Sequence, residues 1–187
     1  MFMARTRSLV RISVELWRQW RTDDVQPAQV VESVNRELCQ NNDERMFVTL
    51  FLGFLDTRTG TLSFVNAGHP APHLLRSGGG AVEMEAKPGL PIGVRQHAKY
   101  DSRTLTLKPC DAIFVCSDGV FEALNENGEL FSIERLNHEL CSAHDADPVE
   151  IVRRVCDAVD SFTGSAPKAD DVTALALRWR PVGLPDE

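Results

Sequence analysis

Two short acidic motifs could do chemistry in this sequence, because each lies beside an apolar run that is typical of a strand. The first is Asp118, which follows the five uncharged residues 112–116 and precedes Gly119. Such a run predicts a strand buried on both faces. Catalytic and binding groups gather where the strands of a layered domain end. The alternative is that Asp118 only caps the turn or helix that begins at Gly119, and taken alone the motif leaves both roles open.

The second motif, Asp170-Asp171, comes directly before residues 172–179, which are predicted to form the final strand. If this strand and residues 112–116 are antiparallel neighbours, the end of one and the start of the other lie at the same sheet edge, so the carboxylates converge. Converging carboxylates need a compensating cation, and a set without His or Cys favours Mg²⁺ or Mn²⁺ over Zn²⁺. Because such ions bind phosphate oxygens and acidify bound water, the motifs predict hydrolysis of a phosphate ester.

Three other patterns are weaker candidates for chemistry. His69 lies in a tight turn before a proline, where a structural histidine is commoner than a general acid. Cys39 and Arg45 have the C-x₅-R spacing of cysteine-dependent phosphatases, but the loop between them is acidic where a phosphate needs backbone N–H groups. The glycines at 78–80 lack a following Lys-Ser/Thr pair and predict a hairpin turn. The acidic motifs therefore remain the main candidates.

The composition is that of one globular domain spanning residues 1–187, with 43% hydrophobic and 25% charged residues. A formal charge of −7 argues against a nucleic-acid partner, because binding to a phosphate backbone needs a basic face. The five cysteines are scattered and never form a C-x-x-C pair, which predicts buried thiols in a reducing cytoplasm rather than disulfides or a zinc site. No apolar stretch approaches the ~20 residues that cross a bilayer, so neither a membrane span nor a signal peptide is predicted.

The predicted elements are helices, a run of antiparallel strands, helices and a last strand. Helices are expected at residues 1–21, from Pro27 to about Leu38, from Ser132, and from Asp147, where Asp147, Pro148 and Glu150 form a capping box. Strands are expected at residues 47–55, 61–66, 73–76, 82–85, 100–107, 112–116 and 172–179, with a short helical piece at 120–124. This order predicts an α+β fold of antiparallel sheets flanked by helices.

Five motifs occur along nearly the whole chain: Met46-Phe-Val-Thr-Leu-Phe-Leu-Gly, Asn66-Ala-Gly-His-Pro, Gly89-Leu-Pro-Ile-Gly, Ser117-Asp-Gly-Val and Asp170-Asp-Val-Thr. Their types and order resemble those of the metal-dependent type-2C protein phosphatases, in particular the bacterial SpoIIE-like branch. The resemblance implies an α-β-β-α sandwich and two Mn²⁺ or Mg²⁺ ions. It also implies dephosphorylation of phosphoserine or phosphothreonine on a partner protein, often an anti-sigma factor antagonist.

Carried onto this chain, the resemblance makes Asp118 and Asp170 catalytic, metal-binding carboxylates and places Gly119 and Asp171 with them in the metal site. The family's first metal motif, Asp-x-x-Gly-His-Gly, would precede Phe2 and is absent from these residues. The chain is therefore expected to be the C-terminal portion of such a domain, with an incomplete second metal site. A homodimer and an upstream sensor or receiver domain are expected as partners, and a membrane is not. The alternative function is a phosphatase-like regulatory module that binds a partner with little turnover.

Overall fold

The chain divides into two compact units in the computed structural model, which describes residues 2–20, 26–40, 42–85, 88–167 and 170–181. Unit 1 consists of Met1–Asp56, Thr61–His69 and Ala86–Thr106. Unit 2 consists of Thr57–Gly60, Pro70–Glu85 and Leu107–Glu187. That residues 1–187 form one domain stays a prediction.

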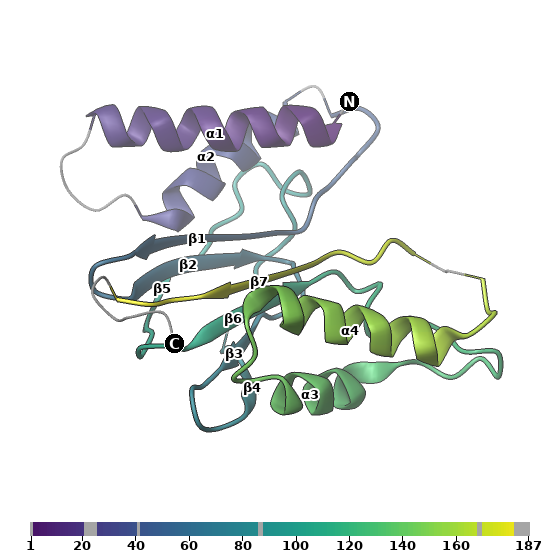
Figure 1. The fold of residues 1–187 in the computed structure, drawn as a ribbon. Coiled ribbons are helices and arrows are strands. Elements are labelled where there is room, and N and C mark those ends of the chain that lie inside the picture. Colours follow the sequence, from purple (N-terminus) through teal and green to yellow (C-terminus); the bar gives the residue numbers. More distant parts are fainter. Residues whose placement is uncertain (1, 21–25, 41, 86–87, 168–169, 182–187) are drawn as a thin grey trace. The chain divides into compact units, whose positions relative to one another are not determined.

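Unit 1 is a three-stranded antiparallel sheet covered by two helices (Figure 1). The strand order is β1-β2-β5, with bounds Leu50–Asp56, Thr61–Ala67 and Arg103–Thr106. Helix α1 (Phe2–Trp20) packs on α2 (Pro27–Cys39), and α2 packs on β1 and β2. Val30, Val34 and Leu38 follow one another at helical spacing on one face of α2, and all three are fully buried. The two predicted N-terminal helices are therefore confirmed.

The first strand of unit 1 begins later than predicted and is less buried. Residues 47–55 were expected to form a strand covered on both faces, whereas β1 begins at Leu50 and its residues are half-buried or exposed. Before it, Val48 exchanges two backbone hydrogen bonds with Ile92, at 3.0 and 2.9 Å, and Phe47 is 60% exposed. The apolar run is continuous, but its backbone partner changes from the loop around Ile92 to β2, and this change shortens the strand.

Unit 2 is a four-stranded antiparallel sheet with two helices packed against it. The strand order is β4-β3-β6-β7, with bounds Ala81–Glu83, His73–Leu75, Ala112–Cys116 and Ala174–Arg178. Helix α4 (Pro148–Thr163) contacts β7, while α3 (Ser132–Ser142) contacts β4 and α4. Phe114 of β6 is fully buried and belongs to one core cluster with Leu136 and Leu140 of α3 and Ile151 of α4. The predicted α+β class, with antiparallel sheets flanked by helices, is confirmed.

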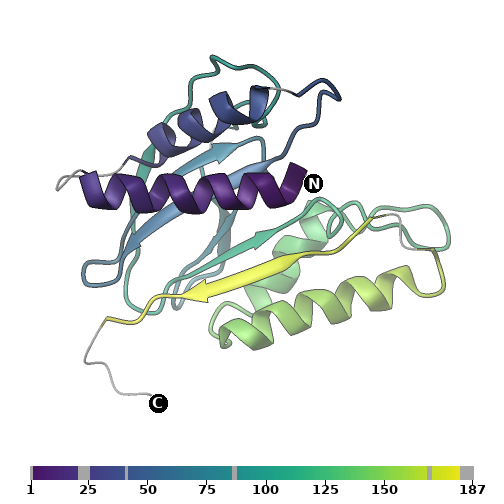
Figure 2. The ribbon, with the colours of Figure 1, turned by 90° about the horizontal axis from the view of Figure 1, so that it is seen from above.

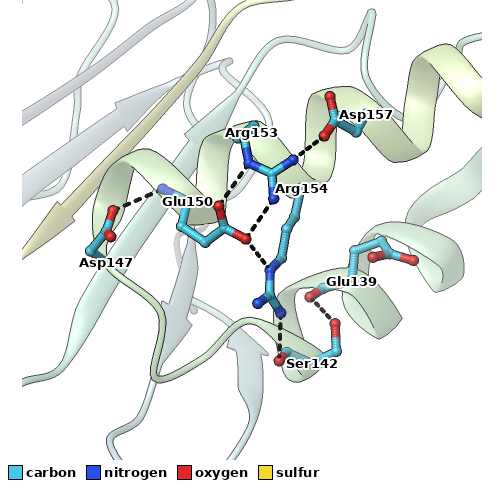
Figure 3. Close-up of polar contacts among 7 residues, drawn as sticks. All are labelled: Glu139, Ser142, Asp147, Glu150, Arg153, Arg154 and Asp157. Carbon is cyan, nitrogen blue, oxygen red and sulfur yellow. Dashed lines mark hydrogen bonds and ion pairs between the residues drawn. The ribbon is translucent and has the colours of Figure 1, made fainter.

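The start of α4 shows how local sequence fixes a helix in this unit (Figure 3). Pro148 occupies the first turn, and the Asp147 carboxylate accepts a hydrogen bond of 2.9 Å from the Glu150 amide. Such a cap contributes about 1 kcal/mol. The role predicted for the Glu150 side chain in the capping box is wrong, because both of its carboxylate oxygens accept hydrogen bonds from Arg153 and Arg154 instead. Those arginines lie one turn further along the same face, where their guanidinium groups reach Glu150.

The short helix predicted at residues 120–124 is absent, and the segment is a turn followed by a bridge from Leu124 to Leu130. The carbonyls of Phe121 and Ala123 accept hydrogen bonds from residues 132 and 131, at 2.8 Å each. In a helix these carbonyls would instead accept from amides four residues further along the chain, so the observed hydrogen bonds replace the helical ones. The Asn125 carboxamide oxygen accepts from the amides of residues 127 and 129 and closes the turn between the two bridged leucines.

The other elements agree with prediction to within a few residues at their ends. The largest difference is β5, which begins at Arg103 rather than at residue 100. Across the described ranges, no helix is both long and apolar enough to span a membrane.

A buried histidine is expected to make the stability of unit 2 dependent on pH. His73 of β3 is 4% exposed, and burial lowers its pKa, against smaller raising contributions from Glu83 and Asn137. Since the folded pKa lies below that of the unfolded chain, the unfolded chain binds more protons, and stability falls as pH drops through about 6.5. One such group contributes a slope of at most about 1.4 kcal/mol per pH unit.

Urea unfolding at pH 7.5 and 5.0 should show this loss, and His73→Gln should reduce the difference between the two pH values. The exposed His97 provides the matched variant His97→Gln, which should keep the parental difference. An unchanged difference in His73→Gln would assign the pH dependence to other groups.

The outer strand of unit 2 is expected to promote self-association. In the described part of the chain β7 ends the strand order, and its Leu175 and Leu177 are 57% and 40% exposed on one face. Open apolar edges recruit further strands. Light scattering at rising concentration should therefore detect oligomers, and Leu175→Lys with Leu177→Lys should shift them toward monomer. Val149→Lys, at a helix position that is 78% exposed, should not. A parent chain that stays monomeric throughout would contradict the expected homodimer.

Candidate functional site

Strands β6 and β7 bring the two acidic motifs together in unit 2. The strands are antiparallel neighbours, and Figure 2 shows them side by side, with β7 in yellow. Cys116 at the end of β6 pairs with Ala174 at the start of β7. Asp118 follows β6 by two residues and Asp170 precedes β7 by four. The ends that carry the carboxylates therefore lie at the same edge of the sheet, as the spacing predicts.

Beyond the regular ladder, Ser117 joins the two motifs. Its amide donates to the Thr173 carbonyl at 2.9 Å, and its hydroxyl donates to the Asp171 carbonyl at 3.0 Å. The same hydroxyl accepts from the Thr173 amide at 3.0 Å. The backbone of Asp171 is therefore held against the residue that precedes Asp118.

Gly119 allows this close approach of the two chain segments. A Cβ atom at this position would lie 2.5 Å from the Asp171 carbonyl oxygen and 3.6 Å from the Asp170 Cβ atom. Real Cβ atoms essentially never approach a carbonyl oxygen that closely. The glycine predicted for the metal site thus contributes by having no side chain, because any other residue would push the two acidic motifs apart.

Both main carboxylates are exposed and partly oriented by their own turns. One oxygen of Asp118 accepts from the Gly119 amide at 3.1 Å, and one oxygen of Asp170 accepts from the Asp171 amide at 2.7 Å. The Asp118 carbonyl also accepts from the Glu122 amide at 2.9 Å. Asp118 therefore organises the turn after β6, as the capping alternative proposes, while the second oxygen of each carboxylate lies outside these bonds.

A cavity of about 150 Å³ opens beside this junction, and Gly119 and Asp170 belong to its lining. Glu122 and Asp160 add two more acidic side chains, and the remaining lining is mostly apolar, as at Val159. Asp118 is not among the lining residues. The structure thus places Asp170 and Gly119 on a cavity and Asp118 on the exposed turn next to it.

The donors at this junction match a hard divalent cation in kind. Asp118 and Asp170 supply only carboxylate oxygens, which Mg²⁺ and Mn²⁺ prefer. Within the residues that the structure describes, however, no group of three or more His, Cys, Asp or Glu side chains is arranged to hold a metal ion. The junction therefore offers two carboxylates of the kind that a divalent cation binds, at neighbouring strand ends, but not a full coordination set.

The sequence alone does not reveal that the Ser117 side chain joins the two acidic motifs. Ser117 is part of a recognisable motif, but its role depends on the register between β6 and β7, which cannot be deduced from a single sequence. Asp171 is exposed; its carbonyl accepts from the Ser117 hydroxyl and its amide donates to the Asp170 carboxylate. Its place in a metal site stays a prediction.

The remaining candidates have structural roles. The His69 amide donates to the Asn66 side chain at 2.8 Å, and its ring contacts the Thr49 hydroxyl at 3.2 Å, so the histidine stabilises a turn of unit 1. Burial raises the pKa of Cys39 and raises that of Cys116 to about 12, which opposes the thiolate that cysteine chemistry needs. The glycines at 78–80 form the hairpin turn between β3 and β4.

Comparison with known sequences identifies the relatives of this chain. The family model of stage II sporulation protein E (SpoIIE) matches residues 1–180. The phosphoserine phosphatase RsbU of Bacillus subtilis is 30% identical over 158 residues, which make up 82% of this chain and 45% of RsbU. Protein IcfG of Synechocystis is 28% identical over 140 residues, or 74% of this chain and 22% of IcfG. The chain thus spans less than half the length of the curated relatives it matches.

Solved structures share the fold. The SiaA-PP2C domain of Pseudomonas aeruginosa has a TM-score of 0.78 at 18% identity, over 95% of this chain and 68% of that one. The RsbU and RsbW domains of Rv1364c from Mycobacterium tuberculosis give 0.71 at 26% identity, over 96% of this chain and 48% of that one. Since the family model covers nearly all of the sequence and these domains share its fold, the chain belongs to the SpoIIE-like branch of the type-2C phosphatase family.

Proposed function

We propose that this chain is part of a metal-dependent protein phosphatase that hydrolyses phosphoserine or phosphothreonine on a regulatory partner protein. The observation that carries the proposal is the pairing of β6 with β7, which sets Asp118 and Asp170 at one sheet edge. Membership of the family and the likeness to RsbU, a protein named as a phosphoserine phosphatase, support it. An anti-sigma factor antagonist is the substrate class that the family resemblance favours.

In the proposed enzyme, Asp118 and Asp170 would hold Mn²⁺ or Mg²⁺. Solved relatives are described with such ions, namely SpoIIE presoaked with Mn and RsbX in complex with magnesium. A bound divalent ion supplies stabilisation of phosphoryl charge and makes water a better nucleophile. Gly119 lets the two acidic motifs approach, and Ser117 holds the Asp171 backbone in place.

A phosphatase-like regulatory module is the second candidate. It is favoured by one observation: among the described residues, no group of three or more His, Cys, Asp or Glu side chains is arranged to hold a metal ion, although Glu122 and Asp160 line the same cavity as Asp170. Two-metal catalysis needs ligands that fix both ions in line with the reacting phosphorus. Such a module would bind a phosphoprotein and release little phosphate.

The two candidates are separated by measuring phosphate release and binding on the same sample. The full natural chain is incubated with phosphoserine and phosphothreonine peptides in Mn²⁺, with and without EDTA. Release that EDTA abolishes is the result expected of the enzyme. Peptide binding by fluorescence anisotropy without release would establish the regulatory module, and absence of both would overturn the two candidates together.

A further inference from the structure

The Ser117 hydroxyl makes two hydrogen bonds to the segment that carries Asp170. It donates to the Asp171 carbonyl and accepts from the Thr173 amide, both at 3.0 Å. A hydroxyl offers one donor, and here the donor and one acceptor position are both used. These bonds come in addition to the backbone bond from the Ser117 amide to Thr173.

The Asp171 carbonyl is confined on two sides as a result. Ser117 holds it through the hydroxyl, and Gly119 lies so close that a Cβ atom there would be 2.5 Å away. Asp171, which receives both contacts, directly follows Asp170. Ser117 and Gly119, which make them, are the two neighbours of Asp118 in the sequence. The two carboxylate residues are therefore linked through their immediate neighbours, by the Ser117 hydroxyl bond and by the close packing of Gly119 against the Asp171 carbonyl.

An ordinary strand end would not need this hydroxyl. The backbone ladder already runs from Cys116 and Ala174 to the bond between residues 117 and 173. The additional bond to Asp171 extends the connection past the ladder to the point where the second acidic motif begins. Removing a group that hydrogen-bonds directly to a metal ligand commonly changes metal affinity by about 10- to 100-fold. Ser117 acts one step further out, through the backbone of Asp171 and Thr173, so a smaller change is expected.

We propose that Ser117 is a positioning residue, whose hydroxyl sets the separation of Asp118 and Asp170 and thereby the affinity of the site for a divalent cation. The inference rests on the proposed function, in which these two carboxylates bind the metal. It assigns to Ser117 a role distinct from that of the carboxylates, since the hydroxyl acts on the ligand-bearing backbone.

The test compares Mn²⁺ affinity in the full natural chain and four variants of it, one of them Asp118→Asn, by calorimetry and by loss of the free Mn²⁺ EPR signal. Ser117→Ala should weaken binding by up to about 10-fold, the lower end of the range for direct partners of metal ligands. Ser117→Thr keeps the hydroxyl and should restore most of the affinity. Ser142→Ala is the matched control, because the Ser142 hydroxyl also donates to a backbone carbonyl, that of Glu139 at 2.8 Å within α3 (Figure 3). It should leave Mn²⁺ affinity unchanged.

Amide hydrogen exchange without metal gives an independent measurement. The Thr173 amide donates to the Ser117 hydroxyl, so its exchange should accelerate in Ser117→Ala and return toward the parental rate in Ser117→Thr. The exchange of amides in α3 and α4 should not change. This pattern would show that the substitution loosens the junction and leaves the rest of unit 2 folded.

The outcomes separate this inference from the function on which it rests. Parental Mn²⁺ affinity in Ser117→Ala, alongside loss of binding in Asp118→Asn, would overturn the role of Ser117 alone. An affinity that also survives Asp118→Asn, or a parent chain that binds no Mn²⁺, would overturn the proposed metal site and the positioning role with it. An equal loss of affinity in Ser142→Ala would show a general effect of instability and would likewise count against Ser117.

Discussion

Asp118→Asn is expected to lower Mn²⁺-dependent phosphate release by about 10²- to 10⁴-fold, because several kcal/mol of charge stabilisation depend on a bound ion. The asparagine has nearly the same shape, and its side-chain oxygen can still accept the hydrogen bond from the Gly119 amide. The charge is therefore removed without removing the contact that organises the turn. Phosphate release at saturating peptide, together with a Mn²⁺ titration, measures the effect.

Asp157→Asn is a suitable control for this experiment. Asp157 is an exposed carboxylate on α4 whose partner is Arg153, as Figure 3 shows. The substitution removes one negative charge from unit 2, as Asp118→Asn does, and should leave phosphate release at the parental rate. If the two variants lose activity equally, the carboxylate at position 118 has no special part in the reaction.

Gly119→Ala is expected to be the most disruptive single-methyl change at the site. Its Cβ atom would lie 2.5 Å from a backbone oxygen of Asp171, which cannot rotate away as a flexible side chain could. Overpacking of this kind costs about 1–3 kcal/mol, and relief of the clash requires the Asp170 segment to move. We therefore expect both a lower free energy of unfolding and a large loss of Mn²⁺ affinity.

Gly79→Ala makes the same chemical change where nothing lies within 4 Å of the new Cβ atom. Its unfolding free energy should stay within about 1 kcal/mol of the parent, because the space is open and alanine restricts the unfolded chain more than glycine. Urea unfolding of both variants gives the comparison. A Gly119→Ala chain that is as stable as Gly79→Ala and binds Mn²⁺ normally would show that the two acidic motifs are not held in close contact.

The parts of the fold that the sequence predicts well are those set by local chemistry. The start of α4 follows from Asp147 and Pro148, and the buried face of α2 follows from the spacing of its valines. From the sequence, the pairing of β6 with β7 could only be assumed, because the register between strands that are distant in the sequence depends on the whole sheet. Once the pairing holds, the convergence of Asp118 and Asp170 follows.

The errors arise where a distant partner decides a local conformation. Residues 120–124 have apolar spacing that suits a helix, but bonds from residues 131 and 132 occupy their carbonyls. Val48 belongs to an apolar run, yet it pairs with Ile92 rather than with β2. The role of Ser117 was missed for the same reason, since its hydroxyl has no assigned partner until Asp171 and Thr173 are placed beside it.

The bond between Ser117 and Thr173 joins residues 56 positions apart, and this separation has a consequence for the order of folding. Closing so long a loop costs entropy before any contact across it forms, whereas α3 and α4 within the loop need only local contacts. We therefore expect the acidic edge to be completed late in folding, after the helices that lie between its two strands in the sequence. A divalent ion would thus meet its two carboxylates only in the nearly finished domain, where it would slow the separation of β7 from β6 rather than guide the early steps of folding.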